Sequence, residues 1–220
     1  MSKGMAWYGE RRSANIPIGT NNLIICCGAE TEKNYFEGVA NFLTEQEQNR
    51  LLRFFIEVDA VDPMNMAKRV RLITDSIEKN KGCKIHNVWV LFDKDDFPDE
   101  NFNNAINKIH SLSTKSVTFY ALWSNECFEL WLLLNFINMH SAISREEYIV
   151  KLEKYLQEKY RKNDKNIFGK IMLKNGSIEK AISYAKSLID IENKTPSNNN
   201  PATNVYRFFE HYSKYLRIWT

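Results

Sequence analysis

Four short apolar runs, each followed by a segment of helical periodicity, constrain the fold of this chain more than any other sequence feature. The runs lie near residues 22–27, 53–58, 87–92 and 116–122. Their length and their β-branched and aromatic content are typical of strands that are covered on both faces. Strands that alternate with helices predict a mostly parallel sheet with right-handed crossovers. The sequence therefore predicts an α/β fold with helices on both faces of the sheet.

The spacing of apolar residues divides the chain into three expected parts. Residues 1–20 are polar and end near Pro17 and Gly19, which predicts an irregular N-terminal arm. Residues 21–140 are expected to form one α/β domain, with helices near 31–42, 65–79, 100–111 and 127–136. Residues 141–220 are expected to form a helical C-terminal part packed on the same domain, with helices near 146–162, 177–190 and 205–216. The Asn- and Pro-rich stretch 192–203 is expected to be an exposed loop.

Composition favours a packed intracellular protein. Hydrophobic residues make up 44% of the 220 residues and aromatic residues 13%, which argues against disorder. The net charge of +3 permits a polyanionic partner without requiring one. The four cysteines form no CxxC pair, and free thiols suit a reducing compartment. Neither a signal peptide nor an apolar run long enough to span a bilayer is visible, so we expect a cytoplasmic protein and no membrane partner.

Polar clusters follow three of the apolar runs, at residues 28–32, 93–96 and 124–129. In an open parallel sheet, ligands bind beyond the carboxyl ends of the strands. Asp93 and Asp95 flank Lys94, so in an extended segment both carboxylates point the same way. Mg²⁺ usually takes one or two such carboxylates together with water and substrate phosphate. We therefore predict a divalent-metal site that faces nucleic-acid phosphate; the alternative is a solvated acidic turn before Pro98.

Other acidic and thiol side chains in these clusters have two interpretations each. Glu30 and Glu32 are candidate site acids, but carboxylates in a first helical turn also complement the helix dipole. Glu129 lies in an apolar helix, where an unpaired carboxylate is costly to bury. It is either a paired structural residue or a site acid with a displaced pKa. Cys27 is interpreted as a buried structural thiol, because no base is indicated beside it.

Candidate substrate contacts are the basic and polar residues of the arm and of the strand ends. They are Arg11, Arg12, Lys94, Ser124 and Asn125. Scattered basic residues are more often simply solvated, which is the competing interpretation. A nucleotide-binding sensor is not indicated, because the chain contains no GxxxxGK[ST] phosphate loop.

Four segments resemble, in order, motifs of the RloB-like proteins, a branch of the TOPRIM superfamily. They are LIICCGAETEKNYF at 23–36, VLFDKDDF at 90–97, ALWSNECFELWLLLNF at 121–136 and NPATNV at 200–205. The resemblance implies a TOPRIM fold in which a glutamate after the first strand and a DxD motif hold Mg²⁺ or Mn²⁺. It also implies nucleic-acid cleavage or joining, and a role in phage defence beside an ATPase partner. Asp93 and Asp95 match the DxD motif, Asp96 extends it, and Glu32 and Glu129 match acidic positions.

One departure from the family pattern leaves the activity open. The usual motif has a glutamate immediately before the glycine, and this chain has Cys27 there. A thiol is a poor Mg²⁺ ligand. Glu30 or Glu32 then takes the role, or the metal preference differs, or the protein does not cut. Our first hypothesis is a metal-dependent nuclease of DNA, RNA or tRNA with Glu32 as auxiliary acid. The alternative is a degenerate module that binds nucleic acid or an ATPase without cutting. Trp7, Trp219 and the late helices can serve a homo-oligomer interface.

Overall fold

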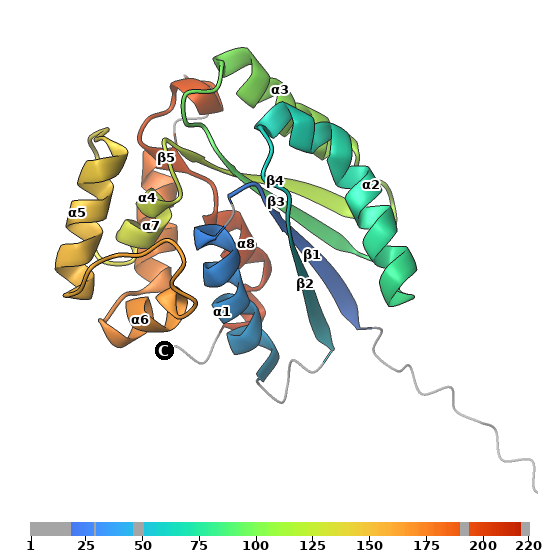
Figure 1. Cartoon of the computed structure of the whole chain (residues 1–220), viewed down its shortest axis with the longest axis horizontal. Coiled ribbons are helices and arrows are strands. Elements are labelled where there is room, and N and C mark those ends of the chain that lie inside the picture. Colours follow the sequence, from blue (N-terminus) through green and yellow to red (C-terminus); the bar gives the residue numbers. More distant parts are fainter. Residues whose placement is uncertain (1–18, 29, 46–50, 190–193, 217–220) are drawn as a thin grey trace, which may run out of the picture.

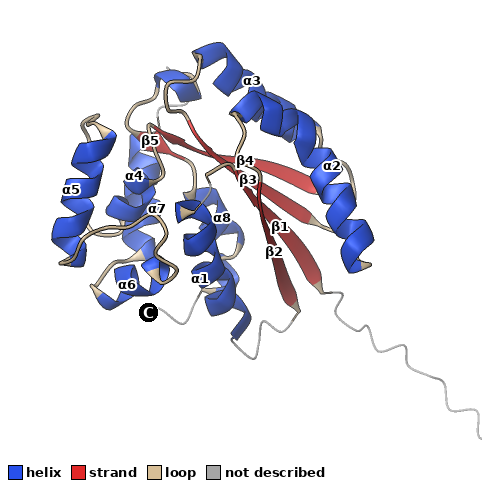
Figure 2. Ribbon diagram, viewed as in Figure 1, coloured by secondary structure: helices blue, strands red, loops and turns tan. Residues whose placement is uncertain are grey.

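Five strands form one sheet in the order β2-β1-β3-β4-β5 (Figures 1 and 2). The computed structural model describes residues 19–28, 30–45, 51–189 and 194–216. Neighbouring strands run parallel except for the last, which is antiparallel to β4. The strands are β1 (Thr20–Cys26), β2 (Leu52–Val58), β3 (Asn87–Asp93), β4 (Thr118–Asn125) and β5 (Ala202–Thr203). The predicted α/β fold with a mostly parallel sheet is confirmed.

The helices lie on both faces of the sheet, as predicted, with α2 and α3 on one face and the others on the opposite face (Figure 2). A helical C-terminal region is also confirmed. The α-helices are α1 (Thr31–Glu45), α2 (Pro63–Lys81), α3 (Asp99–Ser111), α4 (Glu129–Leu134), α5 (Arg145–Leu156), α6 (Ile167–Leu173), α7 (Ile178–Leu188) and α8 (Tyr206–His211). The short helix α6 was not predicted.

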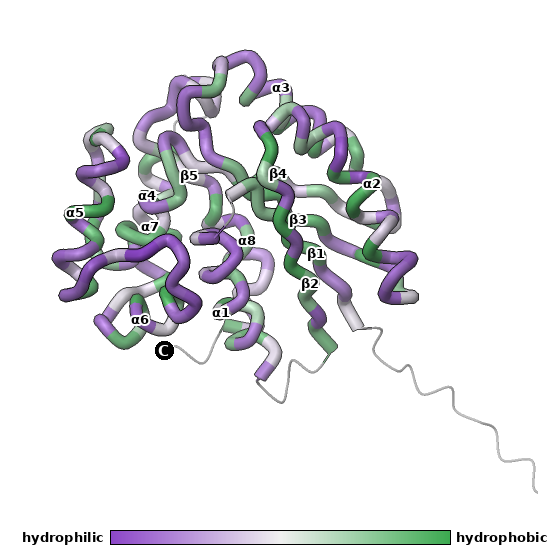
Figure 3. The backbone as a smooth tube through the Cα atoms, in the orientation of Figure 1, coloured by the Kyte–Doolittle hydropathy of each residue, from purple (hydrophilic) through white to green (hydrophobic). Residues whose placement is uncertain are grey.

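Alternating side chains of the central strands supply two hydrophobic cores, one on each face of the sheet. Leu23 and Ile25 of β1 pack in the core under α2 and α3, whereas Ile24 and Cys26 pack in the other core. Successive strand residues point to opposite faces, so a strand covered on both sides must be apolar throughout. Residues 23–26 of β1 and 88–92 of β3 follow this rule, and apolar residues mark these parts of the strands in Figure 3.

Local capping signals explain where the helices begin and end. The side chain of Asp62 accepts a hydrogen bond from the Asn65 backbone N–H at 3.0 Å, and Pro63 follows at the first helical position. Helix α2 therefore begins two residues before the predicted start. Gly82 ends it in the left-handed conformation at φ 62°. Helix α5 ends earlier than predicted, because Gln157 adopts the left-handed conformation at φ 59°.

Two predictions about the β4–β5 edge of the sheet are wrong. The fourth strand was expected to end near residue 122, whereas β4 continues through Ser124 and Asn125, which pair with Thr203 and Ala202 of β5. The stretch 192–203 is not an exposed loop over its described part. It contains a 3-10 helix (Pro196–Asn198) and β5, and several of its side chains are buried. The Asn125 amide donates to the Ser197 carbonyl at 2.7 Å, so side-chain hydrogen bonds satisfy the buried polar backbone there.

Several predictions fall outside the described residues. They concern the arm 1–18, including Trp7, Arg11 and Arg12, and also Trp219. Within the described parts of the chain, no helix has the length and apolar character needed to cross a membrane.

Candidate functional site

Acidic side chains from four separate segments line two adjoining cavities beyond the carboxyl ends of β1 to β4. The first cavity has a volume of about 330 Å³ and the second about 340 Å³. Both are lined by Gly28, Glu32, Asp93 and Asp95, and Glu129 lines the first. The polar clusters expected at the strand ends therefore do meet in space.

The segment after β3 is held in place by the end of β4. The backbone N–H of Lys94 donates to the Ser124 carbonyl at 2.9 Å, and that of Asp95 to the Glu126 carbonyl at 3.2 Å. Asp95 adopts φ 42°, a conformation that aspartate tolerates better than most residues. Asp93 Oδ2 accepts a hydrogen bond from the Phe128 backbone N–H at 3.1 Å, at the entrance to α4. The Asp93 carboxylate and the backbone that carries Asp95 are therefore held in place rather than displayed on a free turn.

Glu32 lies in the first turn of α1 with only 6% of its surface exposed. Gly28 makes room for it, because a side chain at position 28 would collide with the Glu32 carboxylate. Burial raises the pKa of Glu32 from 4.5 to about 6; Glu129 and Asp95 add to this shift, and Lys162 opposes it. Burial also raises the pKa of Asp93, with Glu32, Glu129 and Asp95 contributing. The cavity thus concentrates negative charge in a poorly solvated place.

Glu129 begins α4 and is 2% exposed, yet it has polar partners. Tyr160 donates its hydroxyl hydrogen to Glu129 Oε1 at 3.1 Å, and Lys162 Nζ lies 3.8 Å from the same oxygen. The hydroxyl of Tyr160 also lies 3.1 Å from Thr31 Oγ1. Glu129 is therefore a paired carboxylate that at the same time lines the cavity.

Arg145 is a site residue that sequence reasoning missed. It begins α5 and forms an ion pair with Asp95, while its Nη2 lies 3.7 Å from Asp93 Oδ2. The capping box of Ser144 and Glu147 marks the start of this helix in the sequence. Nothing in the local sequence indicates that the first residue after the cap would reach a strand end fifty positions away.

Other predicted site residues lie elsewhere or have structural partners. Glu30 is exposed at the rim of the first cavity, and Asp96 is exposed and lines neither cavity. Lys94 donates to the Phe97 carbonyl and pairs with Asp99 at 3.1 Å. Ser124 and Asn125 are buried and make hydrogen bonds to the segment that carries β5.

Cys27 lines the second cavity together with Glu32, Asp93 and Asp95. Its backbone N–H donates to the Leu91 carbonyl at 2.9 Å and so continues the pairing of β1 with β3. Burial raises the pKa of the Cys27 thiol, and Glu32 and Asp93 add to the shift. The thiol is therefore neutral at physiological pH, which agrees with its interpretation as a structural thiol.

The donor chemistry of the cavities fits a hard divalent cation. All the candidate ligands are carboxylate oxygens, which Mg²⁺ and Mn²⁺ prefer, and their mutual repulsion would be relieved by a cation. In the described part of the chain, however, no three acidic, histidine or cysteine side chains form a ready-made ligand set. Arg145 and Lys162 supply the cationic groups that line the first cavity.

Comparison with known proteins identifies the family. The family model of RloB-like proteins matches residues 22–211, which include most of β1, all of β2 to β5 and all of α1 to α8. No curated protein and no solved structure matches the chain significantly. Because the match extends over most of the sequence, the chain belongs to the RloB-like protein family.

Proposed function

We propose that this protein is a divalent-metal-dependent phosphodiesterase that cleaves nucleic acid. One observation carries the proposal: Glu32, Asp93, Asp95 and Glu129, from three separate segments, line one cavity beyond the carboxyl ends of parallel strands. Such an arrangement is costly unless a cation or a reaction uses it, because like charges held together in a partly buried place repel one another. The TOPRIM-like motifs of the chain agree with this function.

The side chains have separable roles in this proposal. Asp93 and Asp95 would hold the ion, with Glu129 beside them. A bound Mg²⁺ or Mn²⁺ would neutralise phosphate charge and activate a water molecule for attack. Glu32 would accept a proton, because a pKa of about 6 suits a base near neutral pH. Arg145 is suited to hold a phosphate oxygen, since its guanidinium presents paired N–H donors in a planar fork.

The family resemblance extends the proposal to a cellular role. RloB-like proteins look like phage-defence components that are often encoded beside an ATPase, so we propose such an ATPase as a partner. DNA, RNA and tRNA all contain the phosphodiester on which the site would act. The substrate panel must therefore include all three.

Cleavage assays with matched variants test the proposal. The parent protein, Asp93→Asn and Glu32→Gln are incubated with DNA, RNA and tRNA in Mg²⁺ or Mn²⁺, with and without EDTA. Glu100→Gln is the control, because Glu100 is exposed on α3 and lines neither cavity. We expect cleavage by the parent and the control only, and none in EDTA. Cleavage that persists in EDTA or in Asp93→Asn would contradict the proposal.

A second candidate function is a module that binds nucleic acid or an ATPase without cutting. Cys27 favours it, because a neutral thiol stands where the family motif has a glutamate. Nucleic-acid binding by the parent without cleavage of any substrate in either metal would support this second function.

A further inference from the structure

The segment 158–170, which leaves α5 and enters α6, concentrates positive charge. It contains five basic and two acidic residues, so its net charge equals the +3 of the whole chain. Both acidic residues share one partner: Lys170 Nζ lies 2.5 Å from Glu158 Oε1 and 2.6 Å from Asp164 Oδ2. The remaining cations are Lys159, Arg161, Lys162 and Lys165. The other 25 basic and 25 acidic residues cancel, so this segment accounts for the net charge of the whole chain.

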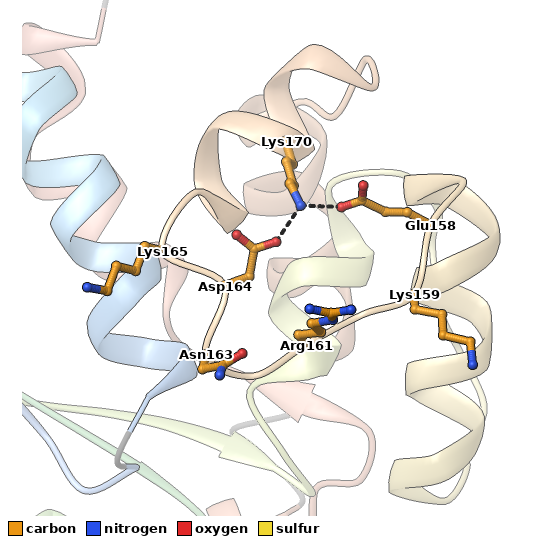
Figure 4. Close-up of a pocket in the computed structure, with 7 residues that line it drawn as sticks. All are labelled: Glu158, Lys159, Arg161, Asn163, Asp164, Lys165 and Lys170. Atoms are coloured by element: carbon orange, nitrogen blue, oxygen red, sulfur yellow. Dashed lines mark hydrogen bonds and ion pairs between the residues drawn. The ribbon is translucent and has the colours of Figure 1, made fainter.

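Lys159, Arg161 and Lys165 line a polar cavity of about 390 Å³. Figure 4 shows the amine of Lys170 between its two carboxylates, while Lys159 and Lys165 extend away from them on opposite sides. Among the described residues, no carboxylate lies within ion-pair distance of Lys159, Arg161 or Lys165. These three side chains therefore form no ion pair within the described residues, although the charge of Arg161 helps to lower the pKa of Asp164.

Hydrogen bonds hold the basic segment 158–170 against the carboxylate site. The Lys162 carbonyl accepts a hydrogen bond from the Asn34 amide at 3.3 Å, and Tyr160 bridges Thr31 and Glu129. Lys162 lines the carboxylate cavity, whereas its neighbours Arg161 and Asn163 line the polar cavity. The two cavities are consequently joined through a few consecutive residues, with negative charge in one and positive charge around the other.

This juxtaposition matches the electrostatic needs of a phosphodiester chain. A buried group of carboxylates repels a polyanion, so the approach of a phosphate chain requires cations within about a Debye length, roughly 8 Å at physiological salt. Sequence-independent binding of nucleic acid rests on such contacts between phosphates and basic side chains. We infer that Lys159, Arg161 and Lys165 bind backbone phosphates of the nucleic acid whose scissile phosphate enters the carboxylate cavity. The choice of nucleic acid as the bound polyanion rests on the proposed function.

Two triple variants that remove the same charge test the inference. The first is Lys159→Gln, Arg161→Gln, Lys165→Gln, which leaves Lys162 and its contact with Glu129 intact. The control is Lys79→Gln, Lys108→Gln, Lys115→Gln, which removes three exposed lysines on the side of the sheet covered by α2 and α3. Binding of labelled single- and double-stranded DNA and RNA is measured by fluorescence anisotropy in EDTA, at several salt concentrations.

We expect the first variant to bind about 10- to 100-fold more weakly than the parent. Because three phosphate contacts are lost, the slope of log affinity against log salt should fall by about 2 for single strands and by nearly 3 for duplexes. The control should stay close to the parent in both measurements. Equal effects of the two variants, or no binding of any nucleic acid by the parent, would overturn the inference.

Separate cleavage measurements in Mg²⁺ or Mn²⁺ distinguish this inference from the proposed function. A parent that binds through these residues but never cuts would refute the nuclease proposal and leave the phosphate contacts of Lys159, Arg161 and Lys165 standing. Conversely, a parent that cuts, together with a first variant that binds as the control does, would refute the inference alone.

Discussion

Arg145 forms an ion pair with Asp95, although fifty residues separate them in the chain. The same guanidinium lies 3.7 Å from Asp93, so the first residue of α5 serves both acids of the DxD motif. These carboxylates belong to a group in which Glu32 and Glu129 also raise the pKa of Asp93. The protein thus carries its own cation at the place where a divalent ion is proposed to bind.

Removal of the Arg145 charge should destabilise the protein, because Asp93 and Asp95 would then repel each other. We expect Arg145→Gln to lower the melting temperature in EDTA, because Asp93 and Asp95 lose their shared positive partner. Added Mn²⁺ should raise the melting temperature of the variant more than that of the parent. Arg145→Lys, which keeps the charge, is the control and should lie between them. Thermal denaturation with and without Mn²⁺ measures these shifts. An unchanged melting temperature of Arg145→Gln in EDTA would contradict the stabilising role of Arg145.

Asp93 and Asp95 should contribute to ion binding, whereas their neighbour Asp96 should not. Asp93→Asn and Asp95→Asn should each weaken Mn²⁺ binding by about tenfold or more, because Mg²⁺-type ions take only one or two protein carboxylates. Asp96→Asn should bind as the parent does, since Asp96 is exposed and lines neither cavity. Isothermal titration calorimetry measures all three. Parent-like affinity in both Asp93→Asn and Asp95→Asn would show that the ion site is elsewhere.

Glu32 should make the metal-free protein less stable as pH rises. Its pKa is about 6 when folded, against an ordinary 4.5, so the folded state binds the proton more tightly. Protonation of Glu32 therefore stabilises the folded state fully below pH 4.5, and this stabilisation is lost as the pH rises through about 6. The change in the free energy of unfolding is about 2 kcal/mol. Denaturant titrations in EDTA across this range should show the loss in the parent and a smaller one in Glu32→Gln. Identical pH profiles would contradict the shift.

Restoring the acid of the family motif should strengthen ion binding. Cys27 lines the same cavity as Asp93 and Asp95, so Cys27→Glu adds a carboxylate there and should raise Mg²⁺ affinity. In a protein that already uses Glu32, cleavage should change modestly, whereas Glu32→Gln should abolish it. In an inactive binding module, Cys27→Glu could create cleavage. Cys27→Gln, which has the same shape without the charge, is the control; equal Mg²⁺ affinities of Cys27→Glu and Cys27→Gln would refute this placement.

Asn204 should be important for the stability of the sheet edge. Its side chain accepts a hydrogen bond from the Trp123 backbone N–H at 2.6 Å and donates one to the Ala121 carbonyl at 2.9 Å. Both partners are buried, so Asn204→Ala should lower the free energy of unfolding by about 2–4 kcal/mol. Asn198→Ala, at an exposed position of the same segment, should change it by less than about 0.5 kcal/mol. Urea denaturation compares the two, and similar losses would argue against this role.

The sequence alone predicted the sheet and the edge at which acidic residues gather. Residues 23–26 of β1 and 88–92 of β3 are all apolar, and only a stretch of strand covered on both faces requires that pattern. Since parallel strands end at a common edge, the clusters after them had to lie near one another. Glu32, Asp93, Asp95 and Glu129 were found in this way, because the rule depends only on strand positions along the chain.

Tertiary structure decided which side chains complete and surround this group of acids. The pairing of Arg145 with Asp95, the contact of Lys162 with Glu129 and the antiparallel addition of β5 all join residues far apart in sequence. Periodicity reports which face of an element is buried, but not which element it meets. The polar stretch around Asn204 resembled a loop for the same reason. Its hydrogen bonds form with the edge of β4, and only packing brings the two segments together.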